Sequence, residues 1–116
     1  ADALVAVEQR ARLMPGSYDA VLIDCFIGGG EVPESCRSRA LAQHVSRILK
    51  PSGTMLQNMW HYSPGKASVA TQFHKTLAVY KDVFSGAVED LQVPMPPTIR
   101  WVDILKATKA RTAGSA

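Results

Sequence analysis

The sequence has few cysteines and no long apolar run, and these two absences exclude whole classes of protein. Its two cysteines, Cys25 and Cys36, stand far apart without a CxxC pair. That spacing indicates neither a zinc site nor a disulfide framework. Because free thiols persist in reducing compartments, we expect an intracellular, cytoplasmic protein. No apolar run approaches the roughly 20 residues of a membrane span, so no membrane association is expected.

A strong charge of one sign is also lacking. The formal net charge is +3, and the basic residues are scattered except near the C-terminus. A nucleic-acid-binding protein would concentrate them on one face, with aromatic residues between them. The basic end, with Lys106, Lys109 and Arg111, is better explained as a solvated, frayed tail. We therefore expect no nucleic-acid partner, and no metal site either, because the three histidines show no ligand spacing with acidic or thiol residues.

The composition is otherwise that of a globular domain, with 47% hydrophobic and 20% charged residues. Hydrophobic periodicity, interrupted by proline and glycine, predicts the element order α-β-α-β-α-β-β. The predicted elements are a helix at 2–13, a strand at 18–24, a helix capped by Ser35 or Ser38 and ending near Leu49, a strand at 54–60, a helix at 66–84, and strands at 87–93 and 98–107.

This order predicts an α/β domain built on one sheet. Strands joined by crossovers of helical length run parallel, whereas the link at 94–97 is too short for a crossover and predicts an antiparallel hairpin. Uninterrupted apolar residues at 20–23, and apolar residues on both faces of the last strand, predict a sheet covered on both faces. His44 lies on the polar side of its helix and is expected to face solvent. The domain would cover residues 1–108, with 109–116 as a disordered tail.

The functional prediction depends on the stretch around Asp24. The apolar run stops at this acidic residue, and three glycines follow at 28–30. In open α/β sheets the ligand crevice lies beyond the carboxyl ends of the strands. Asp24 is therefore a candidate catalytic carboxylate, and the alternative is that it caps the loop while the glycines turn the chain. A nucleophilic role for Cys25 has less support, because a cysteine after a buried strand is more often an apolar filler and no histidine is placed beside it.

Three motifs together resemble a known family. The motif YDAVLID at 18–24, a glycine loop followed by VPE at 32–34, and the turn LKPSG at 49–53 resemble the second half of a class I S-adenosylmethionine-dependent methyltransferase. More narrowly, they are similar to the spermidine synthase-like branch. The resemblance covers nearly the whole chain. It implies the C-terminal half of a Rossmann-like methyltransferase fold, in which parallel strands are closed by an antiparallel hairpin, and S-adenosylmethionine or its decarboxylated form as cofactor.

The resemblance also implies roles for individual residues. Asp2 matches the acidic residue that hydrogen-bonds the adenine amino group in this family, with Ala3 beside it. Alternatively, Asp2 is a carboxylate favoured by the helix dipole. Asp24 matches the aspartate that orients and deprotonates the attacking amine in aminopropyl transferases, a general-base role. The resemblance further places Cys25 and Phe26 beside the cofactor and Trp60, His61 and Tyr62 on the substrate side.

The chain departs from the family pattern in ways that bear on function. It lacks the glycine-rich turn that would hold the cofactor's amino-acid end, and the glycines at 28–30 follow the wrong strand to replace it. Ile27 stands where spermidine synthases carry a second aspartate. We therefore expect a fragment of a methyl or aminopropyl transferase that is inactive alone, or else a catalytically degenerate module with a structural or partner-binding role. Its expected partners are the cofactor and either a missing N-terminal half or a further copy that covers the open sheet edge.

Overall fold

The computed structural model describes residues 3–26, 31–60, 67–85, 87–95 and 99–111. Its helices and strands follow one another in the order predicted from the sequence. No helix in this part of the chain has the length and apolarity that a membrane crossing requires. The elements are α1 (Ala3–Leu13), β1 (Tyr18–Ile23), the 3-10 helix η1 (Glu34–Cys36), α2 (Arg39–Ile48), β2 (Leu49–Met59), α3 (Ala67–Val83), β3 (Val88–Met95) and β4 (Ile99–Thr108).

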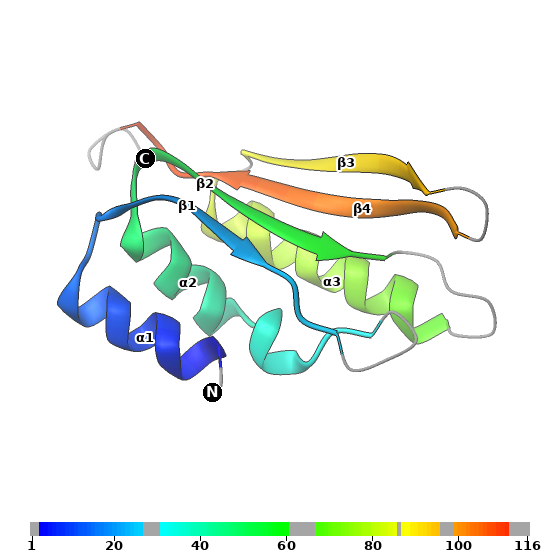
Figure 1. The fold of residues 1–116 in the computed structure, drawn as a ribbon, viewed down its shortest axis with the longest axis horizontal. Helices are drawn as coiled ribbons and strands as arrows, with labels where there is room; N and C mark the ends of the chain where they lie inside the picture. Colours follow the sequence, from blue (N-terminus) through cyan, green and yellow to red (C-terminus); the bar gives the residue numbers. More distant parts are fainter. Residues whose placement is uncertain (1–2, 27–30, 61–66, 86, 96–98, 112–116) are drawn as a thin grey trace.

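The four strands form one open sheet in the order β1-β2-β4-β3 (Figure 1). β1 and β2 are parallel, whereas β4 lies between β2 and β3 and is antiparallel to both. The predicted antiparallel hairpin is therefore confirmed. Because β4 runs against its neighbours, β1, β2 and β3 all point the same way, so their carboxyl ends face one edge of the sheet.

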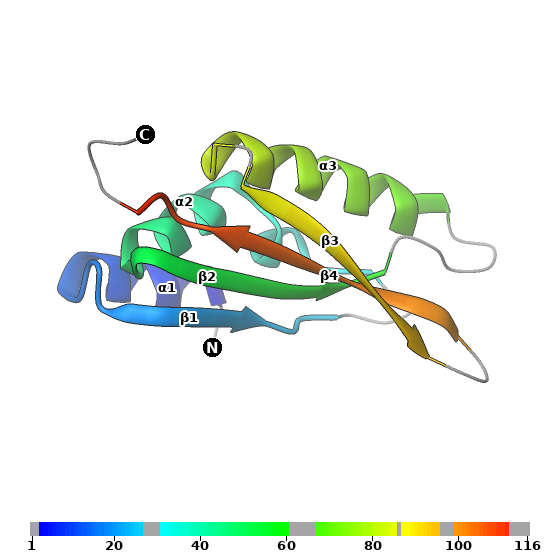
Figure 2. The ribbon, with the colours of Figure 1, turned by 90° about the horizontal axis from the view of Figure 1, so that it is seen from above.

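The three α-helices lie on one face of the sheet (Figure 2). Burial alternates along β2, so that every second side chain from Met55 to Met59 points into the core beneath the helices. The side chains that fill this core come from both the helices and the sheet. They include Leu41 and Val45 of α2, Met55 of β2, Phe73 and Tyr80 of α3, and Leu105 of β4.

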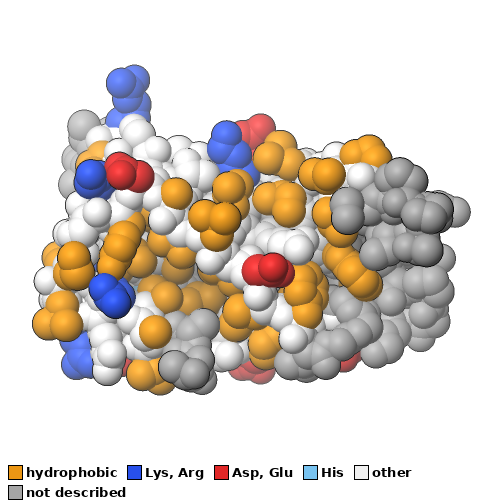
Figure 3. Space-filling model, viewed as in Figure 1, with side chains coloured by type: hydrophobic (Ala, Val, Ile, Leu, Met, Phe, Trp, Pro, Cys, Tyr) orange, Lys and Arg blue, Asp and Glu red, His pale blue; other side chains and the backbone are white. Residues whose placement is uncertain are grey.

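The opposite face of the sheet is bare among the described residues, which corrects the prediction of two covered faces. Leu22 of β1 is 74% exposed, and Leu91 and Val93 of β3 are exposed as well. In the view of Figure 1 the strands lie in front of α2 and α3, and the space-filling view from the same side shows hydrophobic side chains gathered over them (Figure 3). The apolar pattern marked both faces as suited to burial, but it does not say which segment buries each.

The turn predicted at 50–53 lies inside β2 instead of before it. Tyr18 pairs with Leu49 but Ala20 pairs with Thr54, so the intervening residues of β2 bulge out of the ladder. Ser52 has a φ of 68°, and a Cβ on Gly53 would come within 2.7 Å of the Lys50 carbonyl oxygen. Only glycine fits this close approach. The LKPSG motif therefore still forms a turn, but β2 begins five residues earlier than predicted.

Two further differences from the sequence predictions concern His44 and Lys109. His44 is only 19% exposed, and its Nε2 lies 3.9 Å from Glu8 Oε2, because α1 covers this side of α2. The prediction that His44 faces solvent was therefore wrong. Lys109, at the start of the predicted tail, donates its backbone N–H to the Gly53 carbonyl at 2.9 Å. Residues 112–116 of that tail lie outside the described residues.

Candidate functional site

Asp24 directly follows the last residue of β1 and is exposed at the carboxyl edge of the sheet. Ile23 pairs with Gln57 in the parallel ladder, so Asp24 comes beside Asn58 of β2. Asn58 Nδ2 donates a long hydrogen bond to Asp24 Oδ1 at 3.4 Å. The sequence placed Asn58 at a strand end but gave it no role. Its partnership with Asp24 follows from the parallel register.

Two aromatic residues predicted for the site also come together here. The rings of Phe26 and Trp60 lie 5.9 Å apart between centroids, tilted by 44°. Both side chains are half-buried, and each follows the end of one of the two parallel strands. Tilted aromatic pairs at this distance are mutually attractive. The result is an exposed carboxylate, a side-chain amide and two ring faces at one edge of the sheet.

Cys25 is a free, half-buried thiol that packs against the hydrophobic core. The described histidines have other neighbours: His44 lies near Glu8, and His74 makes an edge contact with Phe73. Within the described ranges, no three His, Cys, Asp or Glu side chains gather in a way that could hold a metal ion. Among the described residues, Cys25 therefore has no histidine beside it with which to form a nucleophilic pair.

Several predicted site residues cannot be placed. Ala3 is the first residue of α1, next to the candidate adenine-binding residue. Ile27, which stands at the family's second aspartate position, falls outside the described ranges, as do the glycines at 28–30. The candidate residues Asp2, His61 and Tyr62 also lie outside the described residues.

The chain beyond the glycines is fixed to α3 by polar contacts. Ser68 Oγ donates to Glu31 Oε1 at 2.7 Å, and the Val32 N–H donates to Gln72 Oε1 at 3.1 Å. These contacts join residues 37 to 40 positions apart in the sequence. Neither could be recognised from local patterns, because each joins segments whose proximity depends on the complete fold.

A buried amide ties β2 to the same region. Gln57 is fully buried; its Nε2 donates to the Cys36 carbonyl at 2.6 Å, and its Oε1 accepts a hydrogen bond from the Tyr80 hydroxyl. Burial, followed by the charges of the Cys36 and Cys25 thiols, raises the pKa of Tyr80 well above its ordinary value. Tyr80 therefore remains a neutral hydrogen-bond donor. Sequence reasoning missed Gln57, although it is in phase with the buried Met55 and Met59.

Neither a family profile nor a curated protein matches this chain by sequence. Solved structures do match it in three dimensions. A probable spermidine synthase from Corynebacterium glutamicum superposes with a TM-score of 0.68 and 24% identity, covering 93% of this chain and 36% of that one. A putative DNA modification methylase from Thermus thermophilus gives a TM-score of 0.59 at 15% identity, covering 94% of this chain and 50% of that one.

A third match is the 1,6-didemethyltoxoflavin-N1-methyltransferase of Burkholderia thailandensis, solved with 1,6-didemethyltoxoflavin and S-adenosylhomocysteine bound. Its TM-score is 0.51 at 12% identity, over 83% of this chain and 45% of that one. This chain thus spans between about a third and a half of the lengths of the three structures. The likeness confirms the predicted fold class: the chain has part of the α/β fold shared by S-adenosylmethionine-dependent methyltransferases and spermidine synthase.

Proposed function

We propose that this chain is part of an S-adenosylmethionine-type transferase, moving a methyl or an aminopropyl group, and that Asp24 is its catalytic carboxylate. The observation that carries the proposal is the place of Asp24. It lies exposed at the carboxyl edge of two parallel strands, beside Asn58, in a fold shared with such transferases. That edge is where α/β sheets bind their ligands.

The side chains at this edge fit part of such a cofactor. A sulfonium carries positive charge and an adenine has an aromatic face, and the edge offers the Asp24 carboxylate and the rings of Phe26 and Trp60. The resemblance adds Asp2, Ala3 and Cys25 on the cofactor side. No glycine-rich turn for the amino-acid end is present in the sequence. The cofactor's amino-acid end therefore needs the remainder of the fold, whereas a second copy of this chain can add only residues that this sequence already has.

In the reaction, the bound cofactor supplies an activated carbon next to a sulfonium. The task of Asp24 is to accept a hydrogen bond from the attacking group, hold it in line and take its proton. The Asn58 amide restrains the carboxylate through Oδ1, and Oδ2 is the oxygen that we propose to face a substrate. Trp60, His61 and Tyr62 are the proposed neighbours of the acceptor. The two free thiols suit a reducing, cytoplasmic setting.

Calorimetric titration with S-adenosylmethionine and with 5′-methylthioadenosine tests the cofactor half of the proposal. We expect saturable binding that is lost in Asp2→Ala and largely kept in Asp24→Asn. In the full-length transferase, Asp24→Asn should abolish turnover while changing cofactor affinity little, because it removes the proton acceptor but keeps the side-chain shape. Turnover that survives this substitution would remove Asp24 from the mechanism.

A degenerate, partner-binding module is the second candidate. Ile27 at the position of the family's second aspartate and the bare apolar sheet face both favour it. This alternative predicts a stable oligomer that covers the sheet and no affinity for either ligand. A well-behaved monomer by light scattering would argue against it, whereas ligand binding by an oligomer would favour the transferase with a site completed between copies.

A further inference from the structure

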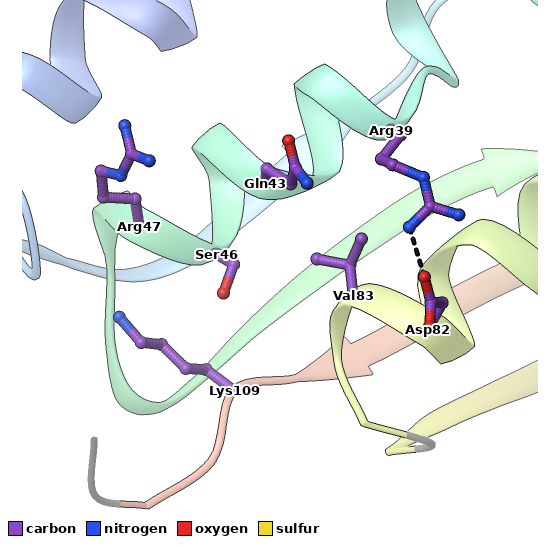
Figure 4. Close-up of a pocket in the computed structure, with 7 residues that line it drawn as sticks. All are labelled: Arg39, Gln43, Ser46, Arg47, Asp82, Val83 and Lys109. Carbon is purple, nitrogen blue, oxygen red and sulfur yellow. Dashed lines mark hydrogen bonds and ion pairs between the residues drawn. The ribbon is translucent and has the colours of Figure 1, made fainter. Parts of the chain in front are cut away.

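We propose that a second site, far from Asp24, binds a ligand carrying a phosphate or diphosphate group. The site is a hollow of about 590 Å³ between α2, the end of α3 and the residue that follows β4 (Figure 4). Ligand pockets in proteins commonly have volumes of about 300 to 1,000 Å³. Its walls are mainly polar, and three of its lining side chains are cationic: Arg39, Arg47 and Lys109.

The charge balance of the hollow is positive. Its acidic lining residue, Asp82, is already paired with Arg39 across the gap between α3 and α2 (Figure 4). Among the described residues, the Arg47 guanidinium forms no ion pair. Figure 4 shows Arg47 at the rim and turned outward, with Ser46 and Lys109 closer to the middle of the hollow. Lys109 is therefore the cation placed to meet an anion in the hollow, and Arg47 adds positive charge at its rim.

These cations are not all needed to cap the helix that ends here. The last carbonyls of α2 already have backbone partners, since Arg47 O accepts from Gly16 N at 2.9 Å and Ile48 O accepts from Ser17 N at 2.8 Å. Lys109 Nζ donates to Leu49 O at 2.7 Å, which anchors the ammonium at the wall of the hollow. An ammonium has three donors. Two N–H donors of Lys109 are therefore available to a ligand, and the Ser46 hydroxyl is a further donor beside them.

The hollow is separate from the candidate transferase site. Lys109 contacts Leu49 at the start of β2, whereas Asp24 contacts Asn58 near its end. Measured along β1, where Tyr18 lies beside Leu49 and Asp24 beside Asn58, six residues of strand separate these positions, which corresponds to about 20 Å at 3.3 Å per residue. A ligand in the hollow therefore cannot touch Asp24, and its binding can be measured without S-adenosylmethionine.

Calorimetric titration of the whole chain with inorganic pyrophosphate at low ionic strength tests the proposal. Lys109→Gln and Ser46→Glu should each weaken binding by about tenfold or more, since charge-assisted hydrogen bonds are lost or a repulsive charge is added. Lys75→Gln makes the same charge change on an exposed residue of α3 outside the hollow. It should change the affinity for pyrophosphate by less than about twofold. Asp82→Asn should strengthen binding several-fold because it removes the acidic group and frees Arg39.

The direction of the Asp82→Asn effect separates a site from a structural ion pair. If the pair only held the helices together, its loss would weaken binding or leave it unchanged, and either result would overturn the proposal. So would the absence of pyrophosphate binding by the unmodified chain, or equal effects of Lys75→Gln and Lys109→Gln. Ser46→Glu leaves the Lys109–Leu49 bond intact, so the test stands even if Lys109→Gln fails to fold.

Discussion

At the scale of single residues, Gln57 shows how one polar side chain can hold three segments in place. It lies on the buried face of β2 and bonds the backbone of η1 and a side chain of α3. A buried amide is costly unless its groups are satisfied, and here donor and acceptor both have partners. Gln57 thus links the strand beside Asp24 to the segment that returns from the glycines.

Replacing Gln57 should be far more damaging than replacing an exposed glutamine. Gln57→Leu keeps most of the volume but leaves the Cys36 carbonyl and the Tyr80 hydroxyl buried without this partner, which should cost about 2 to 4 kcal/mol of unfolding free energy. Gln43→Leu, on the exposed side of α2, is the matched control and should change stability by less than about 0.5 kcal/mol. Urea unfolding measures both, and equal stabilities would show that the buried amide is not needed.

The Tyr80 phenol should give stability a distinctive alkaline dependence. Its pKa is raised in the folded chain, so the unfolded chain loses the proton first. Below about pH 10 both the folded and the unfolded chain carry the neutral phenol, so Tyr80 contributes nothing to the pH dependence of the unfolding free energy. Above it, the unfolding free energy should fall by up to about 1.4 kcal/mol per pH unit. Tyr80→Phe should lose this part of the slope. A tyrosinate absorbance rise in the native chain at the ordinary pKa, assigned to Tyr80 by comparison with Tyr80→Phe, would contradict the expectation.

At the scale of elements, the start of α2 is fixed by one side chain. Ser38 has extended backbone angles, and its Oγ accepts a hydrogen bond from the Leu41 N–H at 3.1 Å. The sequence left Ser35 and Ser38 as equal candidates, since both precede the apolar stripe of the helix. The structure places Ser35 inside η1 and gives the cap to Ser38.

These two serines form a natural pair for a stability measurement. Ser38→Ala should lower the unfolding free energy by about 1 kcal/mol, the usual cost of removing an N-terminal cap. Ser35→Ala removes the same hydroxyl three residues earlier and should change stability by less than about 0.5 kcal/mol. Thermal or urea unfolding of the two variants decides between them. A larger loss in Ser35→Ala would mean that the helix begins elsewhere.

The order and type of the three α-helices and four strands could be predicted because each has its own periodicity, whereas the short 3-10 helix η1 was not predicted. Proline and glycine set most boundaries, but at β2 they mark a bulge in a strand that continues, since pairing with β1 resumes at Thr54. The family resemblance grouped Asp24, Phe26 and Trp60 at one site, and the parallel strands β1 and β2 bring these residues to one edge of the sheet. Gln72 and the burial of His44 depend on how helices pack, and no local pattern carries that information.

At the scale of the whole molecule, the described part of the chain covers one face of the sheet with helices and leaves the other bare. Exposed apolar patches of this kind mark interaction surfaces or aggregation hazards. We therefore expect the isolated chain to self-associate. Leu22→Lys, on the bare face, should reduce the apparent mass in light scattering without lowering the unfolding free energy, because Leu22 is exposed. Leu13→Lys, another exposed leucine but on α1, is the control and should change the apparent mass little.

The position of β4 in the sheet has a consequence for how the chain is made. β4 leaves the ribosome after β1, β2 and β3, yet it lies between β2 and β3 and supplies the pairing partner of both. During synthesis, β1 and β2 can pair early, whereas β3 has no neighbouring strand until some ten residues later. A nascent chain stopped before β4 thus leaves the β4-facing edges of β2 and β3 unpaired, and the four strands can take their final order only after β4 has been synthesised.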